Sequence, residues 1–398
     1  MENLKSYYND KRNVYYDIKI LDYIISLFLL VYLVIDTFNG FLVKTYNLSI
    51  STFVKTFLIL LMIVSIISKK INFTLVVLFC INLLIFSLIV WINNSSDILL
   101  TCSTFSKLYS VPIFFIYFSV SIKNNESIYV VKYTKIMTVS ILVFIFNILA
   151  GLLGFGFPTY NIENGSMGIK GFFYAGNEVS ILFFCLYYYL LSQIPYRKIF
   201  RLMIYFIAFI VSFMIGTKTV IAACFIFSFI DYYYISSKKG KMLFPVISGI
   251  IVLITVYYFQ HTNIYKFFEY RFLTTLDRNK SNILDAITSG RLTALGDFYQ
   301  YWAINFSFLH FMFGIGIHPI KGIEIDFFET FFFFGIITLF FVFCFYLNLI
   351  YKSAIKGNKK LLCFNILYFI ISFFAGHVWF GVMAGFFYAY INSYELNK

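Results

Sequence analysis

The stretch that decides the fold class is residues 324–350, which read EIDFFETFFFFGIITLFFVFCFYLNLI. From residue 330 onward this stretch has no charged side chain, and as a helix it is long enough to cross a hydrocarbon core of about 30 Å. The whole chain repeats the pattern, since 61% of its 398 residues are hydrophobic and only 12% are charged. A soluble domain is roughly a quarter charged. The sequence therefore predicts an all-α polytopic membrane protein that forms one integral membrane domain, residues 1–398.

The apolar runs predict about twelve transmembrane helices. These are expected at 20–36, 50–67, 71–92, 104–122, 136–156, 172–193, 199–215, 218–235, 242–260, 326–350, 361–376 and 378–393. Most Lys and Arg residues fall in the connections on one side, which predicts that both termini are cytoplasmic. The net charge of +13 is then a signal of topology and does not indicate a nucleic-acid partner.

One connection is much longer than the others and is predicted to be external: residues 261–325, between the ninth and tenth spans. Loops of this length are usually functional or disordered. Aromatic residues throughout 298–313 predict a partly ordered segment that lies against the membrane. The cysteines have no spacing typical of zinc or of a disulfide framework.

Two shorter polar stretches are predicted at the same external face. Gly176-Asn177-Glu178 opens the sixth span, and Gly216-Thr217-Lys218-Thr219 joins the seventh and eighth. A charge inside a membrane is usually partnered or functional. At a span's end, however, a lysine can reach the interface, and a glutamate at a helix N-terminus is stabilised by the helix dipole. Three aspartates near span ends are predicted to be interfacial and without a function. They are Asp22, Asp36 and Asp231.

The order of five short motifs carries a resemblance to a known family. The motifs are GNE (176–178), GTKT (216–219), SGR (289–291), FGIG (313–316) and FFGI (333–336). Their order and positions, over roughly 150–350, resemble the superfamily of O-antigen polymerases and O-antigen ligases. The resemblance implies a fold like that of the lipid-dependent membrane glycosyltransferases (GT-C-like). It also implies a glycan donor linked to undecaprenyl diphosphate, with no cofactor and no metal; the chain contains no Asp-x-Asp motif of the kind that binds metal in nucleotide-sugar transferases.

The resemblance also implies which residues bind the diphosphate. Arg291 of SGR matches the loop arginine of the family, and Lys218 stands where ligases have arginine; Arg278 of the same loop is a further candidate. Arginine would hold phosphate with two parallel hydrogen bonds and lysine as a point charge. Other candidate site residues at the external face are Asn177, Glu178 and His377.

The general base is expected in or near the quoted stretch. Ligases have a His-Asn pair where this chain has Glu324, so Glu324 is the first candidate, with Asp326 as its alternate or its orienting partner and His318 as a third candidate. Asp326 and Glu329 also have the spacing of a capping box at a helix start. That structural explanation does not cover Glu324.

These expectations favour a polysaccharide polymerase. It would transfer a growing undecaprenyl-diphosphate-linked glycan onto a new lipid-linked repeat unit at the periplasmic face of a bacterial inner membrane. Its partners would be the lipid-linked donor and acceptor, membrane lipids, and a chain-length regulator and flippase. An O-antigen ligase acting on lipid A-core is the first alternative, and a flippase or transporter is the second. A transporter would be expected to show charges at mid-span, broken helices and internal repeats.

Overall fold

The helices of the chain follow the predicted apolar runs closely. The computed structural model describes residues 20–69, 84, 87, 88, 91, 98–124, 126–162, 165–194, 198–235, 290–317 and 323–398. Its labelled helices are α2 (Tyr32–Tyr46), α3 (Ser51–Ser68), α5 (Ile98–Asn124), α6 (Glu126–Leu152), α7 (Gly176–Gln193), α8 (Lys198–Ile215), α9 (Lys218–Ile235), α13 (Arg291–Ile304), α14 (Phe308–Phe313), α15 (Asp326–Ile355), α16 (Lys359–Phe374) and α17 (Val382–Asn397). The predicted span 242–260, and all but four positions of 71–92, lie outside the described residues.

Several of these helices have the length and composition of membrane spans. Four are long and apolar enough to cross a membrane: Ser51–Ser68, Leu100–Lys123, Tyr133–Leu152 and Asp326–Ile355. A fifth is obtained if the helices Ile20–Leu30 and Tyr32–Tyr46, which meet at a bend of 51°, form one span. Their outer faces expose large apolar side chains such as Phe53, Leu60 and Phe146, which suits a hydrocarbon surrounding. The architecture fits a multi-pass membrane protein, while the number of twelve spans and their orientation remain predictions.

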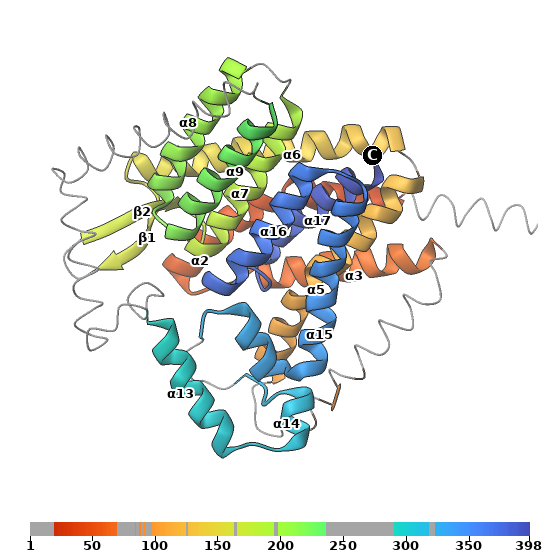
Figure 1. Ribbon diagram of the computed structural model, residues 1–398, viewed down its shortest axis with the longest axis vertical. Coiled ribbons are helices and arrows are strands. Elements are labelled where there is room, and N and C mark those ends of the chain that lie inside the picture. The colour runs from red at the N-terminus through yellow and green to blue at the C-terminus, as the bar shows by residue number, and fades with distance from the viewer. Residues whose placement is uncertain are drawn as a thin grey trace, which may run out of the picture.

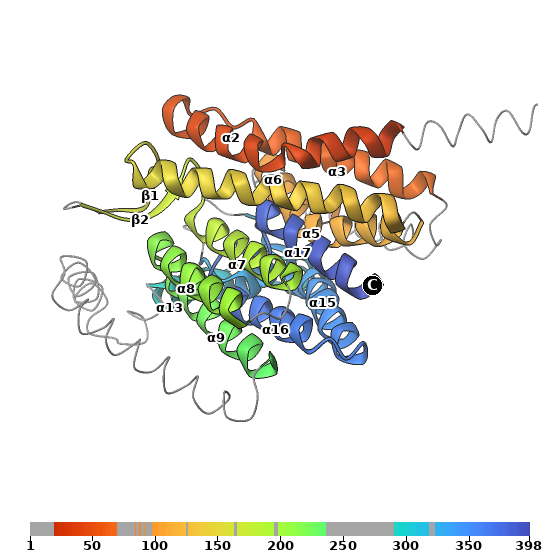
Figure 2. The same ribbon diagram turned by 90° about the horizontal axis from the view of Figure 1, so that it is seen from above.

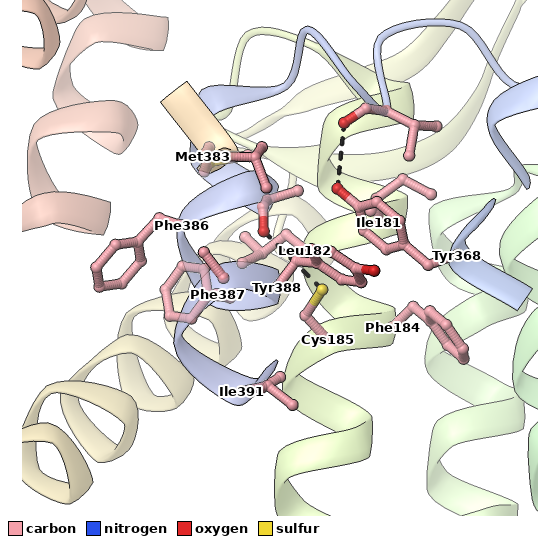
Figure 3. Packing of buried hydrophobic residues seen from close by; sticks show 14 of the residues in the cluster. Ile181, Leu182, Phe184, Cys185, Tyr368, Met383, Phe386, Phe387, Tyr388 and Ile391 are labelled. Atoms are coloured by element: carbon pink, nitrogen blue, oxygen red, sulfur yellow. Dashed lines mark hydrogen bonds between the residues drawn. The ribbon is translucent and has the colours of Figure 1, made fainter. Parts of the chain in front are cut away.

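Helix α17 lies between two groups of helices (Figures 1 and 2). On one side are α2, α3, α5 and α6, and on the other are α7, α8, α9, α15 and α16. α17 packs against α5 and α7, and its residues from Val382 to Ser393 are all buried. The core where α17 meets α7 and α16 contains Cys185, Tyr368 and Tyr388 (Figure 3). The C-terminal helix is thus the central element of the bundle.

A β-hairpin stands where the sequence predicts only a connection between the fifth and sixth spans. Strands β1 (Phe157–Ile162) and β2 (Gly165–Gly171) pair antiparallel. The hydroxyl of Thr159 donates to the carbonyl of Ile215 at 2.8 Å, so the hairpin is fastened to the end of α8. A Cβ at Gly168 would lie 2.4 Å from the same carbonyl oxygen, which explains why a glycine occupies this position.

Helix α15 is broken at Gly335, whose φ of 76° and ψ of 176° are not helical. The backbone carbonyls of Phe332 and Phe333, just before the break, accept hydrogen bonds from another segment of the chain. The N–H of Ile315 donates to the carbonyl of Phe332 at 2.9 Å, and that of Gly316 to Phe333 at 3.1 Å. The FGIG and FFGI motifs therefore meet and form one backbone junction. A Cβ on either Gly314 or Gly335 would collide with the backbone of the other segment.

Three aspartates that the sequence places at the interface are instead buried in ion pairs. Asp22 bonds to Lys69 at 2.8 Å and Asp36 to Lys55 at 2.7 Å. Asp231 is fully buried; it pairs with Arg201 and, at 2.6 Å, with Lys360. The sequence did not predict these ion pairs, because each aspartate finds its cation on a different helix, which spacing along the chain does not reveal; the position of the aspartates at the membrane interface remains a prediction. Tyr205 and the Arg201 contacts to the carbonyls of Leu191 and Ile194 complete the Asp231 cluster.

Candidate functional site

A cavity of about 520 Å³ opens among the helix ends that the sequence predicts to be external. Its wall is contributed by α2, α3, α5, α7, α15 and the loop between α16 and α17. Six ionisable side chains face it: Asp36, Lys55, Lys107, Glu178, Glu329 and His377. The volume is in the range of small-molecule sites, and such convergence of charged groups in one cavity favours a functional site over a packing defect.

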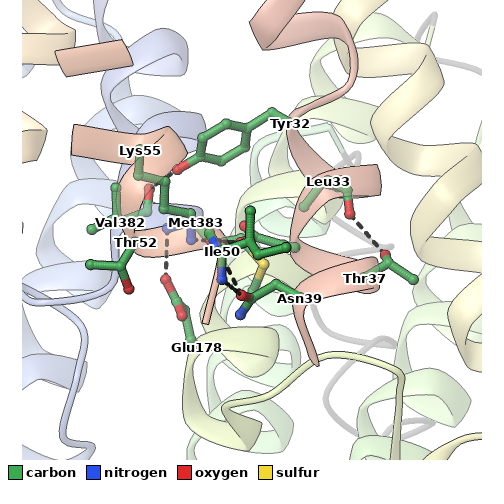
Figure 4. Close-up of polar contacts among 12 residues, drawn as sticks. Tyr32, Leu33, Thr37, Asn39, Ile50, Thr52, Lys55, Glu178, Val382 and Met383 are labelled. Atoms are coloured by element: carbon green, nitrogen blue, oxygen red, sulfur yellow. Dashed lines mark hydrogen bonds and ion pairs between the residues drawn. The ribbon is translucent and has the colours of Figure 1, made fainter. Parts of the chain in front are cut away.

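Glu178, from the GNE motif, is held in the cavity by the start of α17. Its Oε1 accepts the backbone N–H of Met383 at 2.6 Å, one of the N–H groups that a helix start leaves without an intrahelical partner. Figure 4 draws this contact, with Lys55 and Thr52 of α3 nearby. A Cβ on Gly381 would lie 3.3 Å from the same oxygen. Burial disfavours the charge of this side chain, and the N–H of Met383 at the helix start offsets part of that cost.

Asp326 is an anchor for the loop that carries His377. Its two carboxylate oxygens accept the backbone N–H groups of His377, Val378 and Trp379 at 2.7, 2.7 and 2.8 Å, and its side chain is fully buried. The capping-box prediction was wrong on this point, because Ile325 is the N-cap residue and makes no side-chain cap. Three hydrogen bonds from successive backbone N–H groups to one carboxyl group fix the geometry of the loop.

Glu329 and His377 both line the cavity. Oε1 of Glu329 accepts the backbone N–H of Glu324 at 2.8 Å, and Glu329 interacts electrostatically with His377. His377 has a φ of 68° and Glu324 a φ of 57°, conformations that are uncommon for residues with a side chain. Such strain is found preferentially at active sites and binding loops. Gly376 allows the two strained segments to touch, because a Cβ there would lie 2.7 Å from Cα of Glu324.

Arg291 and Glu324, both predicted site residues, lie together but outside the cavity wall. Nη2 of Arg291 donates to Oε2 of Glu324 at 3.0 Å, and half of the Glu324 side chain is exposed. Nη1 of Arg291 also donates to the carbonyl of Phe374. The pair joins the start of α13 to the end of α16. Two of the five guanidinium N–H donors are therefore used within the protein.

The GTKT motif contacts α7 one turn after the GNE motif, through Ser180. The hydroxyls of Ser180 and Thr217 are 2.6 Å apart and buried. Lys218 follows at the start of α9 and is exposed, while Asn177 is half-buried; neither contributes to the cavity wall. His318 and Arg278 lie outside the described residues. Over the described ranges, no group of three or more His, Cys, Asp or Glu side chains is arranged to hold a metal ion.

Sequence reasoning missed Lys55 and Lys107. The signal was present, since each is a lysine a few residues inside a predicted apolar span (50–67 and 104–122), and charges within spans are expected to be functional or paired. Asp36 was seen but interpreted as interfacial. Comparison of the chain with protein-family models, curated proteins and solved structures finds no match, so the site is interpreted from its own residues.

Proposed function

We propose that the protein is a membrane glycosyltransferase that extends a polysaccharide on a polyprenyl-diphosphate carrier, with the cavity as its active site. The observation that carries the proposal is the convergence of Glu178, Glu329 and His377 in one cavity at the helix ends predicted to be external. These residues come from three segments far apart in the sequence. Two of them, Glu178 and His377, are among the candidate site residues that the sequence predicts at the external face.

The reaction would join the anomeric carbon of the growing glycan to a hydroxyl of a new lipid-linked repeat. The bond between the anomeric carbon and the diphosphate oxygen breaks, and the diphosphate leaves with the electron pair. A new bond forms between that carbon and the acceptor oxygen, whose proton passes to a general base. We assign the base to Glu178, because it lines the cavity and its Oε2 is not held by the Met383 contact that fixes Oε1.

The rest of the wall suits a sugar. Hydroxyl side chains on α3 and α5 supply hydrogen-bonding groups, and Phe173, Phe333 and Phe380 supply apolar surface. Glu329 and His377 can accept or donate hydrogen bonds to sugar hydroxyls. A mixture of a few convergent polar groups and aromatic surface is typical of ligand sites.

The proposal is tested with the purified full-length protein in detergent or nanodiscs and lipid-diphosphate-linked repeat units. Wild type should form polymer. The Glu178→Gln variant should lose about 10²- to 10⁴-fold in rate with an unchanged melting temperature. Glu395→Gln is the matched control, because Glu395 lies near the other end of α17 and contacts Asn358; it should polymerise at the wild-type rate. An inactive wild type that joins preformed chains to lipid A-core would instead identify a ligase.

A transporter is the second candidate, and the break in α15 at Gly335 favours it, because broken helices are a feature of transporter sites. The carbonyls of Phe332 and Phe333 at this break are, however, already bonded to Ile315 and Gly316. Movement of a lipid-linked repeat across a vesicle membrane, without polymer, would support the transporter and contradict the glycosyltransferase.

A further inference from the structure

Two lysines give one side of the cavity a positive charge, and neither has a role in the reaction as described above. Lys55 projects from the first turns of α3 and Lys107 from α5, and both line the cavity. Lys107 lies close enough to Lys55 and Glu178 to interact electrostatically with both. Both side chains therefore converge on the same part of the cavity, next to the carboxylate assigned as the base.

The two lysines differ in their existing partners. The ammonium of Lys55 is neutralised by Asp36 at 2.7 Å, and only 15% of its side chain is exposed. Asp36 is held in turn by the hydroxyl of Ser51 at 2.6 Å. Lys107 makes no ion pair of 4 Å or less with any residue that the structure describes. A partly buried ammonium without a close counter-charge is unfavourable, so its environment favours an incoming anion.

The acids of the cavity do not supply that counter-charge directly. Asp36 is paired with Lys55. One oxygen of Glu178 is occupied by the N–H of Met383, and one oxygen of Glu329 by the N–H of Glu324. Hydroxyl groups of α3 and α5 also line the cavity, from Thr52, Thr56, Ser103, Thr104 and Ser106. Those of Thr56, Thr104 and Ser106 donate to backbone carbonyls of their own helices, so Thr52 and Ser103 are the hydroxyl donors that we assign to the ligand. Ammonium and hydroxyl donors together are what phosphate oxygens require.

We propose that Lys107 and Lys55, with the hydroxyls of α3 and α5, form the subsite that binds the diphosphate of a lipid-linked substrate. The identity of the substrate rests on the proposed function, whereas the anion site rests on the two lysines. This differs from the prediction from the motifs, in which Arg291, Lys218 and Arg278 bind the diphosphate. Neither Arg291 nor Lys218 lines the cavity, and Arg278 lies outside the described residues.

The position of this subsite also suits the chemistry. The developing negative charge of a leaving diphosphate would be stabilised by ammonium groups that are already in place. Glu178 lies within electrostatic reach of both lysines, so a base and a leaving-group site share one region. The apolar part of the wall, with Ile59 and Phe333, would accommodate the first isoprene units of the carrier and favours a lipid-linked anion over a free one.

The subsite is tested by binding of inorganic pyrophosphate and of undecaprenyl diphosphate to the purified full-length protein in nanodiscs. Lys107→Gln should weaken the binding of both probes by about tenfold or more, and Lys107→Arg should retain most of it. Lys352→Gln, at the other end of α15, and Lys218→Gln should bind as wild type. Undecaprenyl diphosphate should bind more tightly than pyrophosphate and displace it.

Lys107→Gln is the decisive variant, because it breaks no ion pair among the described residues. Lys55→Gln leaves the buried Asp36 without its ion-pair partner, so its thermal stability has to be measured as well. Wild-type affinity of Lys107→Gln for both probes, or loss of binding only in Arg291→Gln or Lys218→Gln, would overturn the subsite. Lysine-dependent binding of undecaprenyl diphosphate by a protein that forms no polymer would support the subsite and refute the glycosyltransferase.

Discussion

The carboxylate of Asp326 accepts the backbone N–H of Val378 at 2.7 Å, and this contact joins the start of α15 to the loop before α17. The same carboxylate holds the neighbouring N–H groups of His377 and Trp379. An acid in the quoted stretch 324–350 thus shapes the cavity without lining it. Its role is to position the backbone that presents His377.

Replacing Asp326 should therefore cost stability. Asp326→Asn keeps one carbonyl oxygen for three N–H donors, and we expect the free energy of unfolding to fall by about 2–4 kcal/mol, since buried donors are left without a partner. Thermal unfolding in detergent, followed by intrinsic fluorescence, measures the loss. Asp297→Asn, at an exposed position of α13, should melt as wild type. Equal melting of the two variants would contradict the anchor.

The break in α15 makes a contrasting prediction for two glycines. Gly335→Ala should destabilise the fold strongly, because φ is 76° and the new Cβ would lie 2.2 Å from the carbonyl oxygen of Met312. Gly296→Ala, in the middle of α13 with open space around it, should stabilise by about 0.5–1 kcal/mol, the usual gain from Gly to Ala in a helix. Melting temperatures that move in the same direction for both would refute the junction.

The buried cluster around Asp231 should behave as a unit. Asp231→Leu leaves Arg201 buried without its partner and should destabilise by about 3–5 kcal/mol. The double variant Asp231→Leu with Arg201→Met should recover part of that loss, because the buried guanidinium charge is gone, while the remaining cation, Lys360, is partly exposed to solvent. A double-mutant cycle on chemical unfolding gives the coupling energy. Simple additivity of the two single changes would show that the ion pair is not a coupled contact.

The hairpin predicts a pH dependence. Burial, together with the charge of nearby Lys44, lowers the pKa of Lys170 from its ordinary value of 10.5 to about 8. Between these values the unfolded chain binds more protons than the folded one, so stability should rise with pH from about 8 to 10.5; below about 8 the unfavourable charge is fully present. The pH slope of the melting temperature in that window should be smaller in Lys170→Met. An unchanged slope would contradict the prediction.

A variant of the Arg291–Glu324 ion pair distinguishes the two candidates for the general base, Glu324 from the sequence and Glu178 from the cavity. If the cavity is the active site, Glu324→Gln should polymerise lipid-linked repeats within about threefold of wild type, since a half-exposed pair contributes little. Glu178→Gln should be almost inactive in the same assay. The reverse order of activities would restore Glu324 as the base.

The helices could be predicted from the sequence because a long apolar run has few alternatives to a helix: 50–67, 218–235 and 326–350 correspond to α3, α9 and α15 within a few residues, apart from a longer C-terminal end of α15. The hairpin was missed because its strands lie in a short polar connection with no strong alternation. The ion pairs of Asp36 and Asp231 could not be predicted, since each partner comes from another helix. Glu178 and His377 were recognised as candidates from their polar settings at predicted span ends, whereas Lys107 was missed although it is a lysine inside a predicted span.

The junction at Gly335 has a mechanical consequence. Residues 326–334, which carry Asp326 and Glu329, are joined to the rest of α15 by a single non-helical residue and are tied through Ile315 and Gly316 to the segment after α14. The two hydrogen bonds reach Phe332 and Phe333, in the same short helical segment as Glu329. The part of α15 that lines the cavity is therefore fastened to the segment after α14 as well as to the long span that follows it.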